Sequence, residues 1–443
     1  MASLRVVVIG GGSLYTAELA QGFLRRRESL PLDELILVDV PEGREKVEAV
    51  AGLVRRMFAR AGHPARVEVA YDRKPALEGA DFVISQFRVG GTAARGRDER
   101  IPLRHGVIGQ ETTGPGGFSL ALRTVPPALE LAADVRERAP GAWLINFTNP
   151  SGLVTEAIHR HEPKVRSFGL CNVPLGLQRG VARALGVAEE RVTLRTIGLN
   201  HLSWSRVFLD GREITDQVLA SPTAVQEVVA NLPALEPSSP EVETLLAYAR
   251  RLGMIPNPYL RYYFLREATV DEARRLLEAG EGTRADRVER IDRQLLELYR
   301  QPGRAEPPAE LGQRGGAWYS EAALGAMESL WTGRPALHVL NVPNRGATPD
   351  MPPEAVLEVD TSVGPWGVRA VSHGRLRPEL RGLMQAVKAY EELTIEAAVS
   401  GDRGTALAAL AAHPLVPGLR VARELLEELL EAQRPYLPRF FRD

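Results

Sequence analysis

Short apolar runs alternate with helical stretches through the first 170 residues, and this alternation constrains the fold more than any other feature. The apolar runs are "LRVVVIG" (4–10), "DELILVDV" (33–40), "RVEVAY" (66–71), "ADFVISQF" (80–87), "AWLINFTNP" (142–150) and "VRSFGLCNV" (165–173). Helical patterns lie between several of them, near 42–60, 119–138 and 151–161. Strands spaced by helices predict βαβ units and a doubly wound parallel sheet.

The pattern changes after about residue 200. Residues 214–253 have a mostly helical pattern with proline-rich breaks, whereas "RPALHVLNVPN" (334–344) and "AVLEVDTSV" (355–363) are typical of strands. Residues 380–436 carry apolar residues at helical spacing. That spacing predicts two or three amphipathic helices.

Three glycines and a serine follow the first apolar run: Gly10, Gly11, Gly12 and Ser13. Glycines at this point let a pyrophosphate approach the backbone, and the start of the next helix offers N–H donors to it. Asp39 closes the second run, where an acid accepts hydrogen bonds from ribose hydroxyls and repels a 2′-phosphate. The pattern predicts an NAD site; a tight strand-to-helix turn without a ligand is the alternative.

Together these patterns predict an α/β protein of two parts. Residues 1–198 are expected to form an NAD-binding, Rossmann-like domain with a doubly wound, mostly parallel sheet. Residues 199–443 are expected to form a helix-rich α+β domain for substrate binding and oligomerisation. The active site is expected at the interface between the two domains.

Composition excludes several classes of partner. The formal net charge of −1 gives no reason to expect nucleic acid or a membrane surface as a partner. The chain has one cysteine, so it forms no internal disulfide, which is typical of a reducing cytoplasm. No apolar segment approaches the ~20 residues of a membrane span, and the first run is too short for a signal peptide. We therefore expect a cytoplasmic protein that acts on a small molecule.

Polar clusters follow three of the predicted strands, where open α/β sheets bind their ligands. "FRVGGTAARGRDERIPL" (87–103) contains Arg88 and Arg95, and "NFTNPSG" (146–152) contains Asn149. "GLCNVP" (169–174) contains Cys171. The segment "VIGQETTGPGGFS" (107–119) adds Glu111 and a run of glycines, and we expect a flexible binding loop there.

Cys171 and His201 stand in similar settings, "GLCNVP" and "GLNHLSW", thirty positions apart. Taken singly, each is more often a buried core residue than a ligand. Together, a thiolate and an imidazole suit a borderline transition metal, and two protein ligands leave positions open for substrate, as in a catalytic site. A nucleophilic Cys171 with His201 as its base is the alternative.

Three tyrosines lie in "IPNPYLRYYF" (255–264): Tyr259, Tyr262 and Tyr263. We expect two of them to be core residues. A tyrosine acts as a general base when a nearby metal ion or cation pulls its pKa well below ~10.

A set of motifs in fixed order resembles glycoside hydrolase family four over nearly the whole chain. The motifs are "VIGGGS", "FRVGG", "DERIPL", "GVIGQETTGPGG", "NFTNPSG", "GLCNVP", "GLNH", "YLRYY", "GGAWYSEAAL" and "VLNVPNRG". Within the family the likeness is greatest to enzymes that hydrolyse 6-phospho-β-glucosides. This NAD-dependent family is an exception to two-carboxylate glycosidase chemistry.

The resemblance implies NAD and a divalent metal ion, by family habit Mn²⁺, as cofactors. It implies oxidation at C3 of the sugar, loss of the C2 proton, elimination at C1, addition of water and re-reduction at C3. It also implies a homodimer or homotetramer.

The resemblance further assigns a role to each matched residue. It implies Tyr259 as the base with Glu111 beside it; Cys171 and His201 as metal ligands; Gly10, Gly11, Gly12, Ser13, Asp39 and Arg88 for the cofactor; and Arg95, Asn149, Asn172 and Arg284 for the substrate, with Arg284 on its phosphate.

One position departs from the α-glycosidases of the family. They carry an aspartate after the metal-binding cysteine, thought to protonate the leaving group, and this chain has Asn172. An amide is not an acid, so the departure favours a β-linked substrate and leaves the leaving-group acid unassigned. A plain NAD-dependent dehydrogenase of a hydroxy acid or polyol, and a non-catalytic NAD sensor, remain the alternative functions.

Overall fold

In the computed structural model, which describes residues 3–229, 240–314 and 318–442, the strands belong to one continuous sheet. Its order is β10-β8-β7-β12-β11-β6-β5-β4-β1-β2-β3, with β13 paired to β12 and β9 to β8. Strands β1 to β6 pair in parallel, in the doubly wound order 3-2-1-4-5-6. The remaining pairs are antiparallel. The predicted fold class is confirmed.

The parallel strands are β1 (Leu4–Ile9), β2 (Leu32–Val38), β3 (Arg66–Ala70), β4 (Phe82–Ser85), β5 (Trp143–Asn146) and β6 (Arg166–Gly169). The antiparallel strands are β7 (Val192–Leu199), β8 (Leu202–Leu209), β9 (Arg212–Glu213), β10 (Ile255–Pro256), β11 (Ala336–Pro343), β12 (Val356–Gly364) and β13 (Gly367–Ala370). All six apolar runs of the first 170 residues therefore contain a strand.

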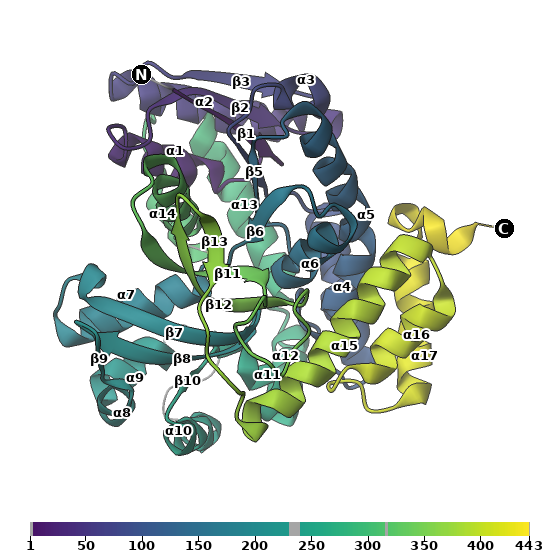
Figure 1. The fold of residues 1–443 in the computed structure, drawn as a ribbon. Coiled ribbons are helices and arrows are strands. Elements are labelled where there is room, and N and C mark those ends of the chain that lie inside the picture. The colour runs from purple at the N-terminus through teal and green to yellow at the C-terminus, as the bar shows by residue number, and fades with distance from the viewer. Residues whose placement is uncertain (1–2, 230–239, 315–317, 443) are drawn as a thin grey trace.

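The helices before the hairpin of β7 and β8 are α1 (Thr16–Arg25), α2 (Arg44–Arg60), α3 (Arg73–Leu77), α4 (Gly91–Arg104), α5 (Gly114–Arg138), α6 (Ser151–His161) and α7 (Val173–Leu185). Those after it are α8 (Thr215–Ala220), α9 (Pro222–Val229), α10 (Pro240–Leu252), α11 (Arg261–Phe264), α12 (Arg266–Glu278), α13 (Arg284–Arg300), α14 (Tyr319–Thr332), α15 (Pro378–Ser400), α16 (Arg403–Ala412) and α17 (Leu419–Ala432). Helices α15, α16 and α17 confirm the predicted amphipathic tail, which packs beside α4 and α5 (Figure 1).

Parts of two sequence-based interpretations lie outside the described residues. They are 230–239 in the predicted helical stretch and 315–317 in "GGAWYSEAAL". No helix in the described ranges has both the length and the apolar character needed to cross a bilayer.

The strand patterns of the second half suggest a small separate sheet, but its strands instead extend the sheet of the first half. Strand β11 joins the edge of β6 through one residue pair, Asn341 opposite Gly169. Only glycine fits at this junction, because a Cβ on Gly169 would lie 2.3 Å from Thr155 Oγ1 and 3.0 Å from Asn341 Cβ. The predicted boundary at 198/199 lies within β7, close to the turn to β8. We keep the two-domain division as a proposal.

The glycine-rich segment 107–119 is not the flexible loop that its composition suggested. Helix α5 begins at Gly114 rather than near residue 119, and its first turn is buried. A Cβ on Gly116 would lie 2.2 Å from the carbonyl oxygen of Gln110, and one on Gly117 would lie 2.5 Å from the backbone of Thr112. These glycines allow the loop before α5 to pack tightly over its first turn, which fixes Glu111 and Thr112 in place.

A buried ion pair holds α4 against α5. Arg123 Nη1 lies 3.1 Å from Asp98 Oδ1, and both side chains are fully buried. Gln433 also donates to Asp98, at 2.8 Å, which ties the C-terminal segment to α4. Helix α4 carries Arg95, so this pair supports one wall of the site described below.

Replacing Arg123 with Met should lower the free energy of unfolding by about 3–5 kcal/mol, because it leaves the Asp98 carboxylate buried without its cation. Arg191→Met, which breaks a pair with Asp210 whose side chains are about half exposed (51% and 53%), should cost less than ~1 kcal/mol. Urea unfolding of the two variants and the wild type measures both values. Equal losses would show that the buried pair does not stabilise α4.

Candidate active site

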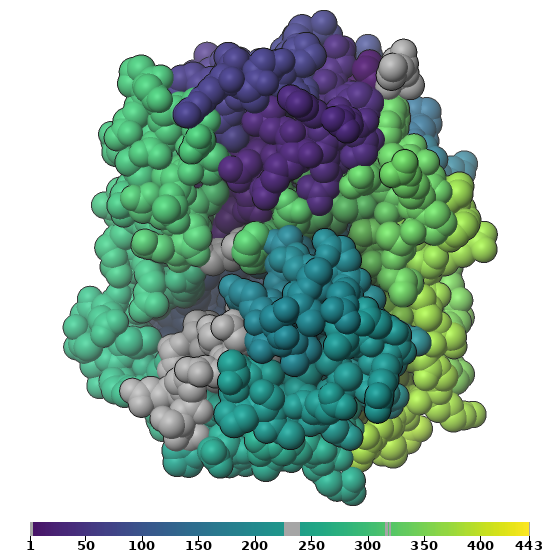
Figure 2. Space-filling view, turned by 90° about the vertical axis from the view of Figure 1, so that its left-hand side faces the viewer, coloured from purple at the N-terminus to yellow at the C-terminus, as the bar shows by residue number. Residues whose placement is uncertain are grey.

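A cavity of about 1280 Å³ opens at the carboxyl ends of the parallel strands. Figure 2 shows the recess between the purple N-terminal part, green residues at the left and teal residues in the centre. Twelve of the fourteen predicted site residues line this cavity: Gly10, Gly12, Ser13, Asp39, Arg88, Arg95, Glu111, Asn149, Asn172, His201, Tyr259 and Arg284. The other two, Gly11 and Cys171, do not line it. The fold thus brings together clusters that are scattered through 275 residues of sequence.

The glycine loop after β1 fits a dinucleotide. Gly10 has φ +83°, and a Cβ on Gly11 would lie 2.6 Å from Leu37 Cβ, so the loop packs on β2 as only glycine allows. Asp39 accepts the N–H of Gly12 at 2.7 Å and stays on the cavity wall. Helix α1 has no side-chain cap, which leaves backbone N–H donors at its start for a phosphate.

Cys171 and His201 meet although they follow different strands. Cys171 follows β6, and His201 is the second residue of the two-residue turn between β7 and β8, where its φ is +65°. Cys171 Sγ and His201 Nε2 are 3.5 Å apart. The predicted pairing of thiol and imidazole is therefore present in the structure.

Thr112 orients the imidazole of His201. The Thr112 hydroxyl donates to Gln110 Oε1 at 2.9 Å, so at 2.7 Å it accepts from Nδ1–H of His201. Nε2 then carries the lone pair and faces Cys171. Burial lowers the pKa of His201 to about 4, which keeps the ring neutral, the form that binds metals.

The surroundings of Cys171 suit a thiolate once a cation is nearby. Burial raises the pKa of the thiol, and the adjacent Glu358 raises it further. The backbone N–H groups of Asn172 and Val173, at the start of α7, and the Asn200 side chain lower it by hydrogen bonds to the sulfur. The described residues contain no group of three or more His, Cys, Asp and Glu that would close a metal site, so this pair fits an ion with open positions.

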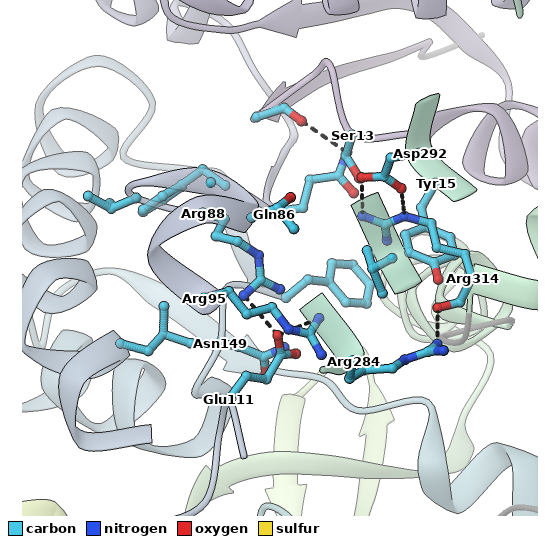
Figure 3. A pocket seen from close by; sticks show the side chains of 18 of the residues that line it. Ser13, Tyr15, Gln86, Arg88, Arg95, Glu111, Asn149, Arg284, Asp292 and Arg314 are labelled. Carbon is cyan, nitrogen blue, oxygen red and sulfur yellow. Dashed lines mark hydrogen bonds and ion pairs between the residues drawn. The ribbon is translucent and has the colours of Figure 1, made fainter. Parts of the chain in front are cut away.

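Glu111 lies between two arginines. Its Oε2 is 2.9 Å from Arg88 Nη1 and 2.7 Å from Arg95 Nη1, and Figure 3 shows both guanidinium groups pointing toward it, with Asn149 close by. Burial opposes ionisation of Glu111, but the two arginines outweigh it and lower the pKa to about 2. Arg95 also contacts Glu99 at 2.6 Å. The carboxylate therefore carries a permanent charge at neutral pH.

Tyr259 stacks on the imidazole of His201. Its ring lies 3.8 Å from the ring of His201, with 7° between the planes, and Tyr262 meets it edge-on. Burial raises the pKa of Tyr259, the neighbouring Tyr262, Glu111 and Cys171 raise it further, and Arg95 lowers it. The protein alone thus does not give the lowered pKa that a tyrosine base needs; its side chains make Tyr259 more basic and keep it protonated.

Arg284 lies on the cavity wall at the first turn of α13, and its side chain is directed toward Arg314 (Figure 3). Its guanidinium donates to the carbonyl oxygen of Arg314. Burial lowers its pKa, as do the charges of Arg95 and Arg287. A bound anion would reduce the repulsion between these neighbouring positive charges. Asn172, in turn, precedes the first turn of α7 and faces the cavity without capping that helix.

Three residues belong to this geometry that the sequence reasoning did not select: Thr112, Asn200 and Glu358. Thr112 and Asn200 neighbour motifs that were noted, "QETTG" and "GLNH", so their proximity to Glu111 and His201 was a usable signal. Glu358 lies in a strand of apolar alternation far along the chain, and nothing in its local sequence points to the site.

Comparison with known proteins gives matches along almost the whole chain. Residues 5–187 match Family 4 glycosyl hydrolase, and residues 196–416 match Family 4 glycosyl hydrolase C-terminal domain. A probable 6-phospho-β-glucosidase of Bacillus subtilis is 44% identical over 99% of this chain and 98% of its own. The 6-phospho-β-glucosidase of Escherichia coli is 38% identical over 99% of this chain and 97% of its own.

Solved structures agree with these matches. The 6-phospho-β-glucosidase of Thermotoga maritima with manganese, NAD⁺ and glucose-6-phosphate is 38% identical, covers 98% of this chain and 99% of its own, and has a TM-score of 0.87. A malate dehydrogenase of Cryptosporidium parvum is 14% identical over 90% of this chain and all of its own, with a TM-score of 0.53. The second likeness concerns the fold alone.

Glu111→Gln should lower the free energy of unfolding by about 3 kcal/mol at pH 7, because the pKa of Glu111 is about 2 in the folded chain against an ordinary value near 4.5. A pKa that folding lowers stabilises the folded state at pH values above the pKa of the unfolded chain. This stabilisation is lost as pH falls toward the pKa of the folded chain. The difference in Tm from wild type should therefore narrow between pH ~5 and ~2. Thermal melts across this range test it, with the mostly exposed Glu306→Gln as control; a constant difference would contradict it.

Proposed function

Because this chain belongs to family 4 of the glycosyl hydrolases, we propose that it hydrolyses 6-phospho-β-glucosides through temporary oxidation of the sugar. The observation that carries the proposal is the buried group of Cys171 Sγ and His201 Nε2, 3.5 Å apart, with the Tyr259 ring stacked on His201. A thiol, an imidazole and a phenol in contact at the end of a dinucleotide-binding sheet suit the removal of a proton next to a carbonyl.

Two cofactors complete the site in this proposal. Residues 10–13 and Asp39 would hold NAD with Arg88 beside it, and Cys171 and His201 would hold a divalent metal ion, Mn²⁺ by the resemblance. When bound, NAD⁺ accepts a hydride from C3 of the sugar and later returns it, and the metal ion supplies the positive charge that makes the C2 proton acidic. The Thermotoga maritima relative was solved with manganese and NAD⁺, which supports this assignment.

The proposed role of Tyr259 is to take the C2 proton on its phenolic oxygen. Glu111 and burial raise the affinity of that oxygen for a proton. The permanent charge of Glu111 keeps Arg88 and Arg95 in place on either side of it. Loss of the C2 proton expels the leaving group from C1, and water then adds there. The proton that the leaving group needs is not assigned to a residue.

The remaining residues bind the substrate in this proposal. Arg284, already beside Arg95 and Arg287, would bind the 6-phosphate, for which bidentate arginine contacts are suited. Arg95, Asn149 and Asn172 would bind sugar hydroxyls. Because Asn172 is not an acid, the site suits a β-linkage over the α-linkage. The homodimer or homotetramer implied by the resemblance stays a prediction.

The decisive assay compares nitrophenyl 6-phospho-β-glucoside with its α-anomer. Hydrolysis of the β-anomer should require NAD⁺, Mn²⁺ and a reductant together, and omission of any one should reduce the rate by at least about tenfold. NADH should not accumulate, because the hydride returns to the sugar. Accumulation of NADH without release of nitrophenol would identify a dehydrogenase and overturn the proposal. Equal or faster cleavage of the α-anomer would also overturn it, because the proposed substrate is β-linked.

Tyr259→Phe should slow the exchange of the C2 proton with solvent by roughly 10²–10⁴-fold, the usual contribution of a general base. Deuterium incorporation at C2 of the released sugar phosphate in D₂O measures it. Tyr262→Phe is the matched control, since Tyr262, like Tyr259, is half-buried on the cavity wall, and the two rings contact each other. Unchanged exchange in Tyr259→Phe would assign the base to another group.

A further inference from the structure

A buried carboxylate on β12, that of Glu358, lies behind the candidate active site. Its residue is 1% exposed and sits opposite Gly198 of β7, two residues before the turn that carries His201. Each of its oxygens accepts one strong hydrogen bond, and each bond leads to a different part of the site.

The first branch leads to the metal-binding pair. Asn200 donates from Nδ2 to Glu358 Oε1 at 2.9 Å. Asn200 is the other residue of the turn that holds His201, and its side chain also bonds to the sulfur of Cys171. Through this one amide, Glu358 influences the position of both donor atoms.

The second branch leads to Tyr259. Ser203 donates from Oγ to Glu358 Oε2 at 2.6 Å, and Asn257 donates from Nδ2 to Ser203 Oγ at 3.2 Å. Asn257 Oδ1 then accepts the backbone N–H of Tyr259 at 3.0 Å and so caps the turn on which that tyrosine lies. The branch therefore fixes the backbone that carries the proposed base.

The two branches end on rings that touch, since Tyr259 and His201 stack at 3.8 Å. Only an acceptor with two free oxygens satisfies both branches, because Asn200 and Ser203 both donate. Among the described residues no lysine, arginine or histidine pairs with Glu358, so the carboxyl group is buried without a cation. Burying a carboxyl group without a cation lowers the stability of the fold, and a side chain that only filled space would not need to be charged.

We propose that Glu358 is a positioning residue that sets the Cys171–His201 pair and Tyr259 in register with each other through Asn200 on one side and Ser203 with Asn257 on the other. The inference rests on the proposed function, because it assumes that the pair binds a divalent metal ion and that Tyr259 removes a proton. Glu358 itself does not line the cavity and acts through the residues that do.

Cys171 is the only cysteine of the chain, so a thiol reagent reports on the pair alone. The rate of maleimide labelling of the full-length protein is measured against Mn²⁺ concentration, with NAD and substrate absent. The Mn²⁺ concentration that halves the rate gives an apparent affinity that does not depend on turnover.

Glu358→Gln keeps the shape of the side chain and replaces one acceptor with a donor. It should raise the half-protecting Mn²⁺ concentration by about 10–100-fold, the usual effect of losing a partner that orients a metal ligand. Asp360→Asn is the matched control. Asp360 lies on the same strand with the same 1% exposure, but its partners are the backbone N–H of Thr196 at 3.1 Å and the side chains of Arg195 and His373, none of which lines the cavity. Mn²⁺ should protect Cys171 in this variant at the same concentration as in the wild type.

Ser203→Ala cuts the second branch and keeps the first. It should leave the Mn²⁺ protection within about twofold of wild type and lower kcat and C2-deuterium incorporation by about tenfold or more, with KM little changed. This variant decides the question if Glu358→Gln does not fold: a Ser203→Ala protein with normal deuterium incorporation overturns the proposal.

The outcomes separate this inference from the proposed function. Wild-type labelling that Mn²⁺ does not slow would overturn the metal role of Cys171 and the inference with it. If Mn²⁺ protects the wild type, two results would overturn the inference alone and leave the proposed function standing. One is an unchanged half-protecting Mn²⁺ concentration in Glu358→Gln, and the other is an equal shift of that concentration in Asp360→Asn.

Discussion

The narrow junction between β6 and β11 is the constraint on which the candidate site depends. One residue pair, Gly169 with Asn341, joins the parallel strands to the antiparallel ones. From there the sheet continues through β12 to β7. Cys171 follows the end of β6, and His201 follows the end of β7. The registers of these strands therefore decide how far apart the thiol and the imidazole lie, and a side chain on Gly169 would force the two halves apart.

Charge within the site is unevenly distributed. Glu111 is held ionised by Arg88 and Arg95, whereas burial raises the pKa of Cys171 and of Tyr259 so that both keep their protons. At neutral pH the chain alone therefore has a neutral His201 with a protonated Cys171 and a protonated Tyr259 beside it. Added positive charge at this point would release protons from both, which is how the arrangement suits a metal-dependent proton transfer.

The parallel half of the fold was predictable because buried parallel strands are continuous apolar runs that helices separate. The hairpin of β7 and β8 was missed, since its turn is Asn200–His201 rather than a glycine-containing pair. The glycines of segment 107–119 were misread as flexibility, because the close backbone packing that needs them comes from tertiary structure. Many of the predicted site residues followed strand ends, and twelve of the fourteen were found on the cavity wall. Glu358 acts from behind that wall, where no local pattern reveals it.

The same sheet accounts for the position of the proposed base. Tyr259 follows β10, the edge strand next to β8, and β8 follows the turn that holds His201. Asn257 N–H also donates to the carbonyl oxygen of Ser203 at 2.8 Å, so the chain before Tyr259 continues the strand pairing. The proposed base and His201 are therefore carried by neighbouring strands of one sheet, whereas Cys171 follows β6, farther along the same sheet. Their relative positions depend on backbone pairing and on the side chains that bridge those strands. A substitution in β12 can therefore alter the chemistry although the substituted residue does not contact the substrate.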